Sequence, residues 1–122
     1  MTRAGSRSCL KTINPDTNER YTRLFSAKDG TAEYLKSGYV VLGKAESIGE
    51  HSTGPREEVL IIIEGKGRLI LNKSDHIDIE KNRVLYIGPN TIHDVHNTGA
   101  GSLRYIYVTS PAGGDDGSDK KG

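Results

Sequence analysis

Cysteine is nearly absent from this 122-residue sequence, and so are long apolar segments. Cys9 stands alone, which excludes a disulfide bond within the chain and a cysteine pair for metal binding. We therefore expect a protein of a reducing compartment, the cytoplasm. No apolar stretch is long enough to cross a bilayer, and none follows Arg3 and Arg7 as in a secretory signal, so we expect neither a membrane protein nor a secreted one.

An excess of charge of one sign is also missing. Lysine and arginine together number 17, aspartate and glutamate 16. A protein that binds nucleic acid or an anionic membrane through charge usually carries a clear basic excess. The even balance argues against both as the main partner.

Apolar residues make up only 34% of the chain, whereas glycine occurs 15 times. This composition is lean for a helical protein but typical of a turn-rich β domain with a small core. The length suits one domain. We predict an N-terminal arm over residues 1–20, a β domain over 21–110, and a disordered tail over 111–122, where no apolar residue follows Ala112.

Short apolar or alternating segments, separated by turn residues, predict strands at the even spacing of a barrel or sandwich. The expected strands cover residues 21–25, 39–42, 59–63, 68–71, 76–79, 83–87, 92–97 and 103–109. The turn Gly65-Lys66-Gly67 predicts a hairpin between the third and fourth of these. Residues 31–36 fit either one helical turn or a strand edge.

Two stretches contain residues suited to metal chemistry. The stretch from Gly49 to Gly65 places His51 and Glu58 at the two ends of a short loop, and His93 begins a strand thirty residues on. Two imidazoles and one carboxylate suit a divalent first-row transition metal, so we predict these three side chains as its ligands. Each has a plainer interpretation, because a histidine can be structural or exposed and a carboxylate at a strand start is often solvated.

Together the two stretches resemble the paired motifs of the cupin superfamily, over about residues 38–109. His51, Glu58 and Gly65 match the first motif, and His93 and Asn97 match the second. The resemblance implies a small single-domain cupin of the conserved-barrel type. Its fold would be all-β, an antiparallel cupin-type β-barrel, also described as a jelly-roll-like double-stranded β-helix.

The departures from the family pattern are informative. Thr53 stands where the first motif usually has a second histidine, and a hydroxyl is a poor transition-metal ligand, so four protein ligands become three. We expect Thr53 and Asn97 beside the metal, with Thr53 able to hydrogen-bond a metal-bound water. Asn82 and Asn90 replace two motif glycines, and asparagine tolerates the left-handed backbone that such turns require.

Strand periodicity tests these assignments. If His93 points into the barrel, Val95 and Asn97 do too, while His96 points outward. By the same count Glu58 shares the face of Leu60, whereas Glu57 lies on the opposite face. His76 and His96 are therefore expected at the surface. For the last strand, the sequence leaves open whether the face of Leu103, Tyr105 and Tyr107 or the face of Arg104 and Ile106 lines the cavity.

Two functions of different classes fit the sequence. The first is a cupin that binds a small organic molecule, such as a sugar, an organic acid or a polyketide-like compound, at a divalent-metal site. The metal would be Fe, Mn, Ni or Zn, and the chemistry that of a dioxygenase, isomerase, cyclase or lyase. The second is a non-catalytic binding protein with a degenerate, metal-free site.

We also predict a homodimer, because Val59, Ile61 and Ile63 face out of a small barrel, and because the resemblance implies it, since single-domain cupins are commonly dimers.

Overall fold

The computed structural model describes residues 10–113, and over this range the ordered elements are all strands. In chain order they are β1 (Tyr21–Ser26), β2 (Lys36–Leu42), β3 (His51–Ser52), β4 (Arg56–Glu64), β5 (Lys66–Leu71), β6 (Asp75–Glu80), β7 (Val84–Ile87), β8 (Ile92–Asn97) and β9 (Leu103–Pro111). Within the described residues there is no helix that could span a membrane.

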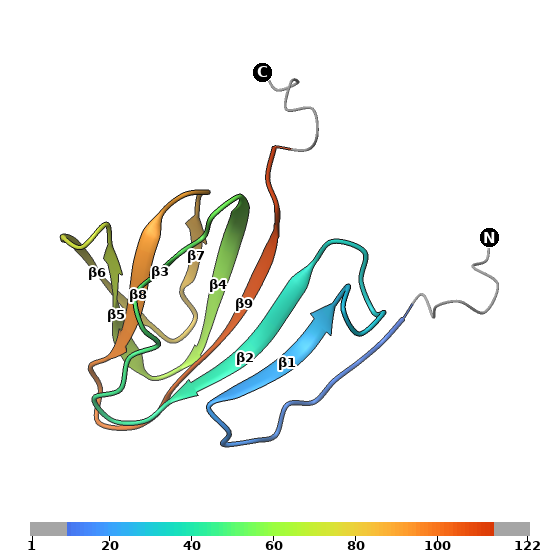
Figure 1. Cartoon of the computed structure of the whole chain (residues 1–122). Helices are drawn as coiled ribbons and strands as arrows, with labels where there is room; N and C mark the ends of the chain where they lie inside the picture. The colour runs from blue at the N-terminus through green and yellow to red at the C-terminus, as the bar shows by residue number, and fades with distance from the viewer. Residues whose placement is uncertain (1–9, 114–122) are drawn as a thin grey trace.

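The strands form two antiparallel sheets that face each other (Figure 1). The larger sheet has the order β1-β2-β9-β4-β7, and the smaller one has the order β3-β8-β5-β6. This arrangement confirms the predicted all-β jelly roll. Hydrogen bonding does not close the sheets into a barrel, since each sheet keeps two edge strands.

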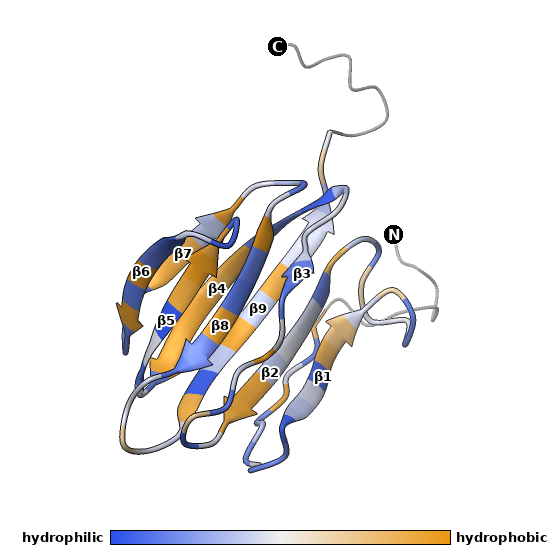
Figure 2. Ribbon diagram, turned by 60° about the vertical axis from the view of Figure 1, so that its left-hand side comes forward, coloured by the Kyte–Doolittle hydropathy of each residue, from blue (hydrophilic) through white to orange (hydrophobic). Residues whose placement is uncertain are grey.

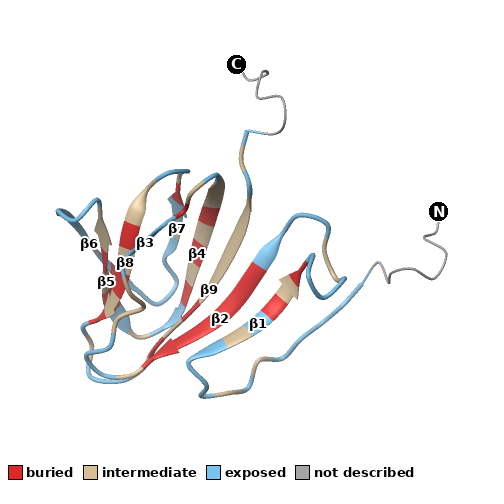
Figure 3. Cartoon of the chain, viewed as in Figure 1, coloured by how far each residue is buried: buried red, intermediate tan, exposed pale blue. Residues whose placement is uncertain are grey.

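The core lies between the two sheets and receives alternate residues from both (Figures 2 and 3). Period-two alternation explains this, because every second side chain of a strand points to the same face. The most buried members are aliphatic and come from six strands: Val40, Leu42, Leu60, Ile62, Leu69, Ile79, Val95 and Leu103. Leu60 and Ile62 share their inward face with Glu58, as the sequence predicts.

All eight expected strands are present, most of them longer by one to three residues. The sequence analysis missed β3, because a strand of only two residues has no periodicity to detect. Residues 31–35 form bends and irregular backbone rather than a helical turn, and Lys36 begins β2. Asn82 and Asn90 adopt positive φ angles of 73° and 53°, which confirms the left-handed turns expected at both positions.

The prediction of a hairpin at Gly65-Lys66-Gly67 is wrong, because β4 and β5 do not pair with each other. The turn is sharp, but β4 pairs with β7 and β9, whereas β5 pairs with β6 and β8. Gly65 therefore carries the chain from one sheet to the other. A hairpin and a crossover of this kind share the same local pattern of apolar strand, glycine turn and apolar strand, so the sequence cannot separate them.

The predicted arm is only partly within the described residues, which begin at residue 10, so Cys9 lies outside them. Residues 10–20 have no regular hydrogen-bonded structure but are attached to the larger sheet. The Arg104 guanidinium donates hydrogen bonds to the Thr17 carbonyl oxygen at 2.9 Å and to Asn18 Oδ1 at 2.5 Å. Of the predicted tail, Pro111 still belongs to β9, and residues 114–122 lie outside the described part of the chain.

Candidate metal centre

The structure brings His51, Glu58 and His93 together between the two sheets. Glu58 projects from β4 of the larger sheet, while His51 on β3 and His93 on β8 are directly opposed in the smaller one. Their ligand atoms all lie within 4.8 Å of one another. The imidazole rings have centroids 4.2 Å apart and are tilted by 58°. Residues far apart in the sequence thus converge on one point.

Both histidines are oriented by backbone carbonyl groups. His51 Nδ1 lies 2.8 Å from the Gly49 oxygen, and His93 Nδ1 lies 3.1 Å from the Thr91 oxygen. A carbonyl oxygen can only accept, so each Nδ1 must carry the proton, and the Nε2 of a neutral ring is left with a free lone pair. This is the tautomer that a metal-ligating histidine requires, and a carbonyl acceptor at the second nitrogen is common among such ligands.

Glu58 and His93 are buried, with 8% and 1% of their surface exposed, whereas His51 is exposed. His93 Nε2 lies 3.3 Å from Glu58 Oε1. Burial of the imidazole lowers the pKa of His93, whereas the contacts with Glu58 and with the Thr91 carbonyl raise it. The two contacts together outweigh burial, so the net shift of the His93 pKa is upward. Without a metal, a protonated His93 therefore donates its Nε2 proton to the Glu58 carboxylate. If a metal were bound, the same two groups would give up that proton and could serve as its ligands.

The raised pKa of His93 predicts a pH-dependent stability of the metal-free protein. A histidine whose pKa is higher in the folded state stabilises the fold fully below its unfolded pKa of about 6.5, and this contribution disappears as pH rises through the folded pKa. We expect Glu58→Gln to destabilise the protein more at pH 6 than at pH 9. The difference is about 1.4 kcal/mol for each tenfold by which the proton affinity of His93 is higher in the folded than in the unfolded state. Urea unfolding with a chelator present measures the difference. An equal cost at both pH values would contradict this prediction.

The Thr53 hydroxyl joins the two motif loops. It donates to the Gly88 carbonyl oxygen at 2.7 Å and accepts from the Thr91 amide at 3.0 Å. The Thr53 amide in turn donates to the Thr91 carbonyl. Because the single hydroxyl proton goes to Gly88, Thr53 can meet a metal-bound water only as an acceptor. Its position beside His51 fixes the loop that carries that histidine.

Asn97, which the sequence places next to the metal, lies at the opposite end of β8 from His93. Its buried side-chain amide donates to the carbonyl oxygens of Leu42, Gly43 and Gly101 at 2.8 to 3.0 Å, and its oxygen accepts from the Gly99 amide. These hydrogen bonds join two loops at the end of the sandwich. The structure therefore gives Asn97 a role in holding loops, in place of the expected position beside the ligands.

The remaining candidates lie where strand periodicity predicts. His96 points out of the smaller sheet, where its Nε2 lies 2.9 Å from Asp94 Oδ2. His76 is exposed on β6. Glu57 lies on the outer face of β4 and accepts a hydrogen bond from the Tyr86 hydroxyl at 2.8 Å. These side chains do not contribute to the site.

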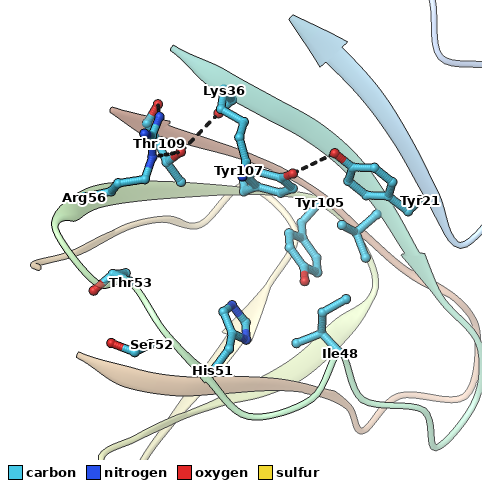
Figure 4. A pocket seen from close by; sticks show the side chains of 11 residues that line it. Tyr21, Lys36, Ile48, His51, Ser52, Thr53, Arg56, Tyr105, Tyr107 and Thr109 are labelled. Carbon is cyan, nitrogen blue, oxygen red and sulfur yellow. Dashed lines mark hydrogen bonds between the residues drawn. The ribbon is translucent and has the colours of Figure 1, made fainter. Parts of the chain in front are cut away.

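A cavity of about 310 Å³ opens beside the centre (Figure 4). Its walls come from β1, β2, β3, β9 and the start of β4, and the lining residues are Tyr21, Lys36, Val40, Ile48, His51, Ser52, Thr53, Arg56, Tyr105, Tyr107 and Thr109. The structure thus settles the question left open for the last strand: Tyr105 and Tyr107 face inward with Leu103. Since His51 lines this cavity, a molecule inside it lies against the candidate metal centre.

Sequence analysis missed Arg56 and Lys36 as lining residues. Arg56 lies directly before the apolar part of β4 and resembles an ordinary solvated strand end. Tyr105 and Tyr107 were ambiguous because both faces of β9 are rich in large residues, so hydrophobic alternation gives no signal. Only pairing with β2, which opposes Tyr105 to Val40 and Tyr107 to Gly38, assigns the face.

Comparisons with known proteins agree with the fold and the motif positions. The family model described as "Cupin domain" matches residues 38–109. An uncharacterised protein of Methanocaldococcus jannaschii is 28% identical over 82 residues, which cover 67% of this chain and 63% of that protein. The chain therefore matches less than two thirds of that relative.

Solved structures show the same architecture. A protein of Bacillus halodurans aligns with a TM-score of 0.71 at 20% identity, covering 79% of this chain and 73% of its own. An RmlC-like cupin family protein of double-stranded β-helix fold, from Methanocaldococcus jannaschii, aligns with a TM-score of 0.70 at 19% identity, covering 85% and 91%. At such identities the likeness concerns the fold. The family model covers well over half of the sequence, and the chain belongs to the cupin family.

Proposed function

We propose that the protein binds one divalent transition metal ion through His51, Glu58 and His93, and holds a small organic molecule in the adjoining cavity. The observation that carries this proposal is the convergence of three donor groups within 4.8 Å, with both imidazoles oriented through Nδ1. Two histidines and one carboxylate leave further coordination positions open. The cavity beside His51 is where a molecule could reach them.

The donor set fits iron, manganese, nickel and zinc. Such a metal supplies either a Lewis acid or a centre that activates oxygen, which suits isomerase, cyclase, lyase or dioxygenase chemistry. The chain itself contributes the orientation of the ligands and a mostly apolar cavity beside them.

Titration of the chelator-treated protein with Zn(II), Fe(II) and Ni(II) tests the proposal. We expect one ion per chain and an increase in melting temperature, because an ion that binds only the folded state stabilises it. Absence of binding for all of these ions would overturn the metal centre. The function would then be small-molecule binding without a metal, which the replacement of a ligand histidine by Thr53 favours.

We further propose that the protein is a homodimer. The outer patch, formed by Val59, Ile61, Ile63, Val84 and Tyr86, supports this, because β4 and β7 pair so that these side chains share the outer face. Val84 and Tyr86 remain 62% and 64% exposed. Contiguous exposed apolar side chains on a sheet face mark an association surface. In addition, β7 is an edge strand with one side unpaired within the described chain.

Val84→Lys is expected to convert the dimer into a monomer, because a charge would be buried in an apolar interface. Light scattering at micromolar concentration measures the mass. His76→Lys places the same side chain on an exposed position of the other sheet, and we expect this control to remain a dimer. A monomeric wild type would refute the proposal.

A further inference from the structure

The cavity next to the metal centre is lined by two basic side chains and no carboxylate. Lys36 at the start of β2 and Arg56 at the start of β4 both line it, and neither makes an ion pair within residues 10–113. Glu58 is not among the lining residues, and its Oε1 lies 3.3 Å from His93 Nε2. Cations without counter-ions at the edge of a mostly apolar cavity create a positive potential for a bound molecule.

The Arg56 guanidinium is held in place by neutral acceptors. Its Nε donates to Thr109 Oγ1 at 2.9 Å, and its Nη2 donates to the Tyr34 carbonyl at 3.0 Å. These hydrogen bonds fix the plane of the group without neutralising its charge. Nη2 also donates to the Thr109 carbonyl at 3.4 Å, so the N–H groups of Nη1 are the ones left to donate charge-assisted hydrogen bonds to a carboxylate.

Tyr105 provides a second, independent indication of a ligand. Only 3% of this residue is exposed, while its hydroxyl oxygen is not fully buried and makes no hydrogen bond to any described residue. Figure 4 shows the hydroxyl pointing into the cavity, on the side of His51 and Ile48. Burial and the nearby Glu58 raise the pKa of Tyr105, so the phenol keeps its proton and can donate. A phenol that opens onto the cavity without a protein partner is free to donate to a bound molecule.

Tyr107, two residues further along β9, differs from Tyr105 because its hydroxyl has a protein partner. Its hydroxyl lies 2.8 Å from that of Tyr21, and the two rings stack with centroids 6.2 Å apart. This pair forms an apolar wall between the cationic edge and the interior. The cavity thus has a cationic edge, an apolar middle and the Tyr105 hydroxyl near the metal centre.

We propose that the ligand is a small organic acid whose carboxylate binds Arg56 and Lys36, whose apolar body lies against Val40, Ile48 and Tyr107, and whose inner end accepts a hydrogen bond from Tyr105. This inference rests on the proposed function for the location of the inner end beside the metal. The carboxylate site itself does not need the metal.

Phenylacetate and phenylacetamide test the charge preference, because they have nearly the same shape and differ in charge. Binding is measured by calorimetry or ligand-observed NMR at pH 8, with chelator and again with Zn(II). For the metal-free wild type we expect phenylacetate to bind about tenfold more tightly than phenylacetamide, the range of a charge-assisted hydrogen bond. Arg56→Gln should abolish the preference and Arg56→Lys should keep part of it. Lys66→Met, at an exposed lysine remote from the cavity, should leave it unchanged.

Tyr105→Phe separates the second contact from the first. The para-methoxy derivatives of both probes carry an ether oxygen at the inner end, and we expect Tyr105→Phe to weaken these two derivatives by severalfold while leaving their ratio unchanged, because the phenol contacts the inner end and not the carboxylate. A preference for phenylacetate that appears only with Zn(II), or that survives Arg56→Gln, would place the carboxylate on the metal and overturn the proposal. Failure of both probes to bind at millimolar concentration would also overturn it. A preference in the metal-free protein combined with failure to bind any ion would refute the metal centre alone.

Discussion

His93→Ala is expected to weaken metal binding by at least about a hundredfold, whereas His96→Ala leaves it unchanged. Removal of groups that merely orient ligands already costs about 10- to 100-fold in metal affinity, and the loss of a ligand from a set of three costs more. His93 is buried with its Nε2 beside Glu58, while His96 points outward to Asp94. Both variants remove an imidazole from the same strand, so the comparison isolates the direction of the side chain.

Zinc titration and metal analysis of the purified variants measure this difference. Circular dichroism checks that both retain the β fold. His96→Ala also leaves intact the hydrogen bond from the Gly49 amide to Asp94 Oδ1, which holds the loop before His51. If both variants bound zinc as the wild type does, His93 would not be a ligand.

Gly65→Ala is expected to lower the free energy of unfolding by roughly 3 kcal/mol or more. Gly65 has a φ of +93°, and a Cβ there would lie 2.3 Å from the Ser102 carbonyl oxygen and 2.9 Å from Leu103 Cα. A non-glycine residue in this conformation costs about 1 to 3 kcal/mol, and displacing packed backbone costs a similar amount. The contact is with backbone atoms of the turn before β9, so it cannot be relieved by rotating a side chain.

Gly101→Ala is the matched control. A Cβ at Gly101 meets nothing within 4 Å and its φ is not in the left-handed region, so we expect a change below about 0.5 kcal/mol. Urea unfolding monitored by circular dichroism gives both values. Equal stability of the two variants would show that the crossover at Gly65 relaxes easily, contrary to this expectation.

The crossover at Gly65 also shows where sequence reasoning reaches its limit. The apolar strands on either side and the glycine between them are evident in the sequence, and both strands exist. Whether they pair with each other depends on their partners: β4 lies beside β9, and β5 lies beside β8. Those pairings join residues 22 to 55 positions apart, which no local pattern encodes.

The sequence by itself determined the positions of eight strands and the inward faces of Glu58 and His93, because side chains alternate with a period of two along every strand. It also identified the left-handed turns at Asn82 and Asn90, which are set by local backbone sterics. The tertiary structure alone decided which strands share a sheet, that the two-residue β3 opposes His51 to His93, and that Lys36, Arg56 and Tyr105 meet around one cavity. These features depend on register between distant strands, which is fixed by packing of the whole core.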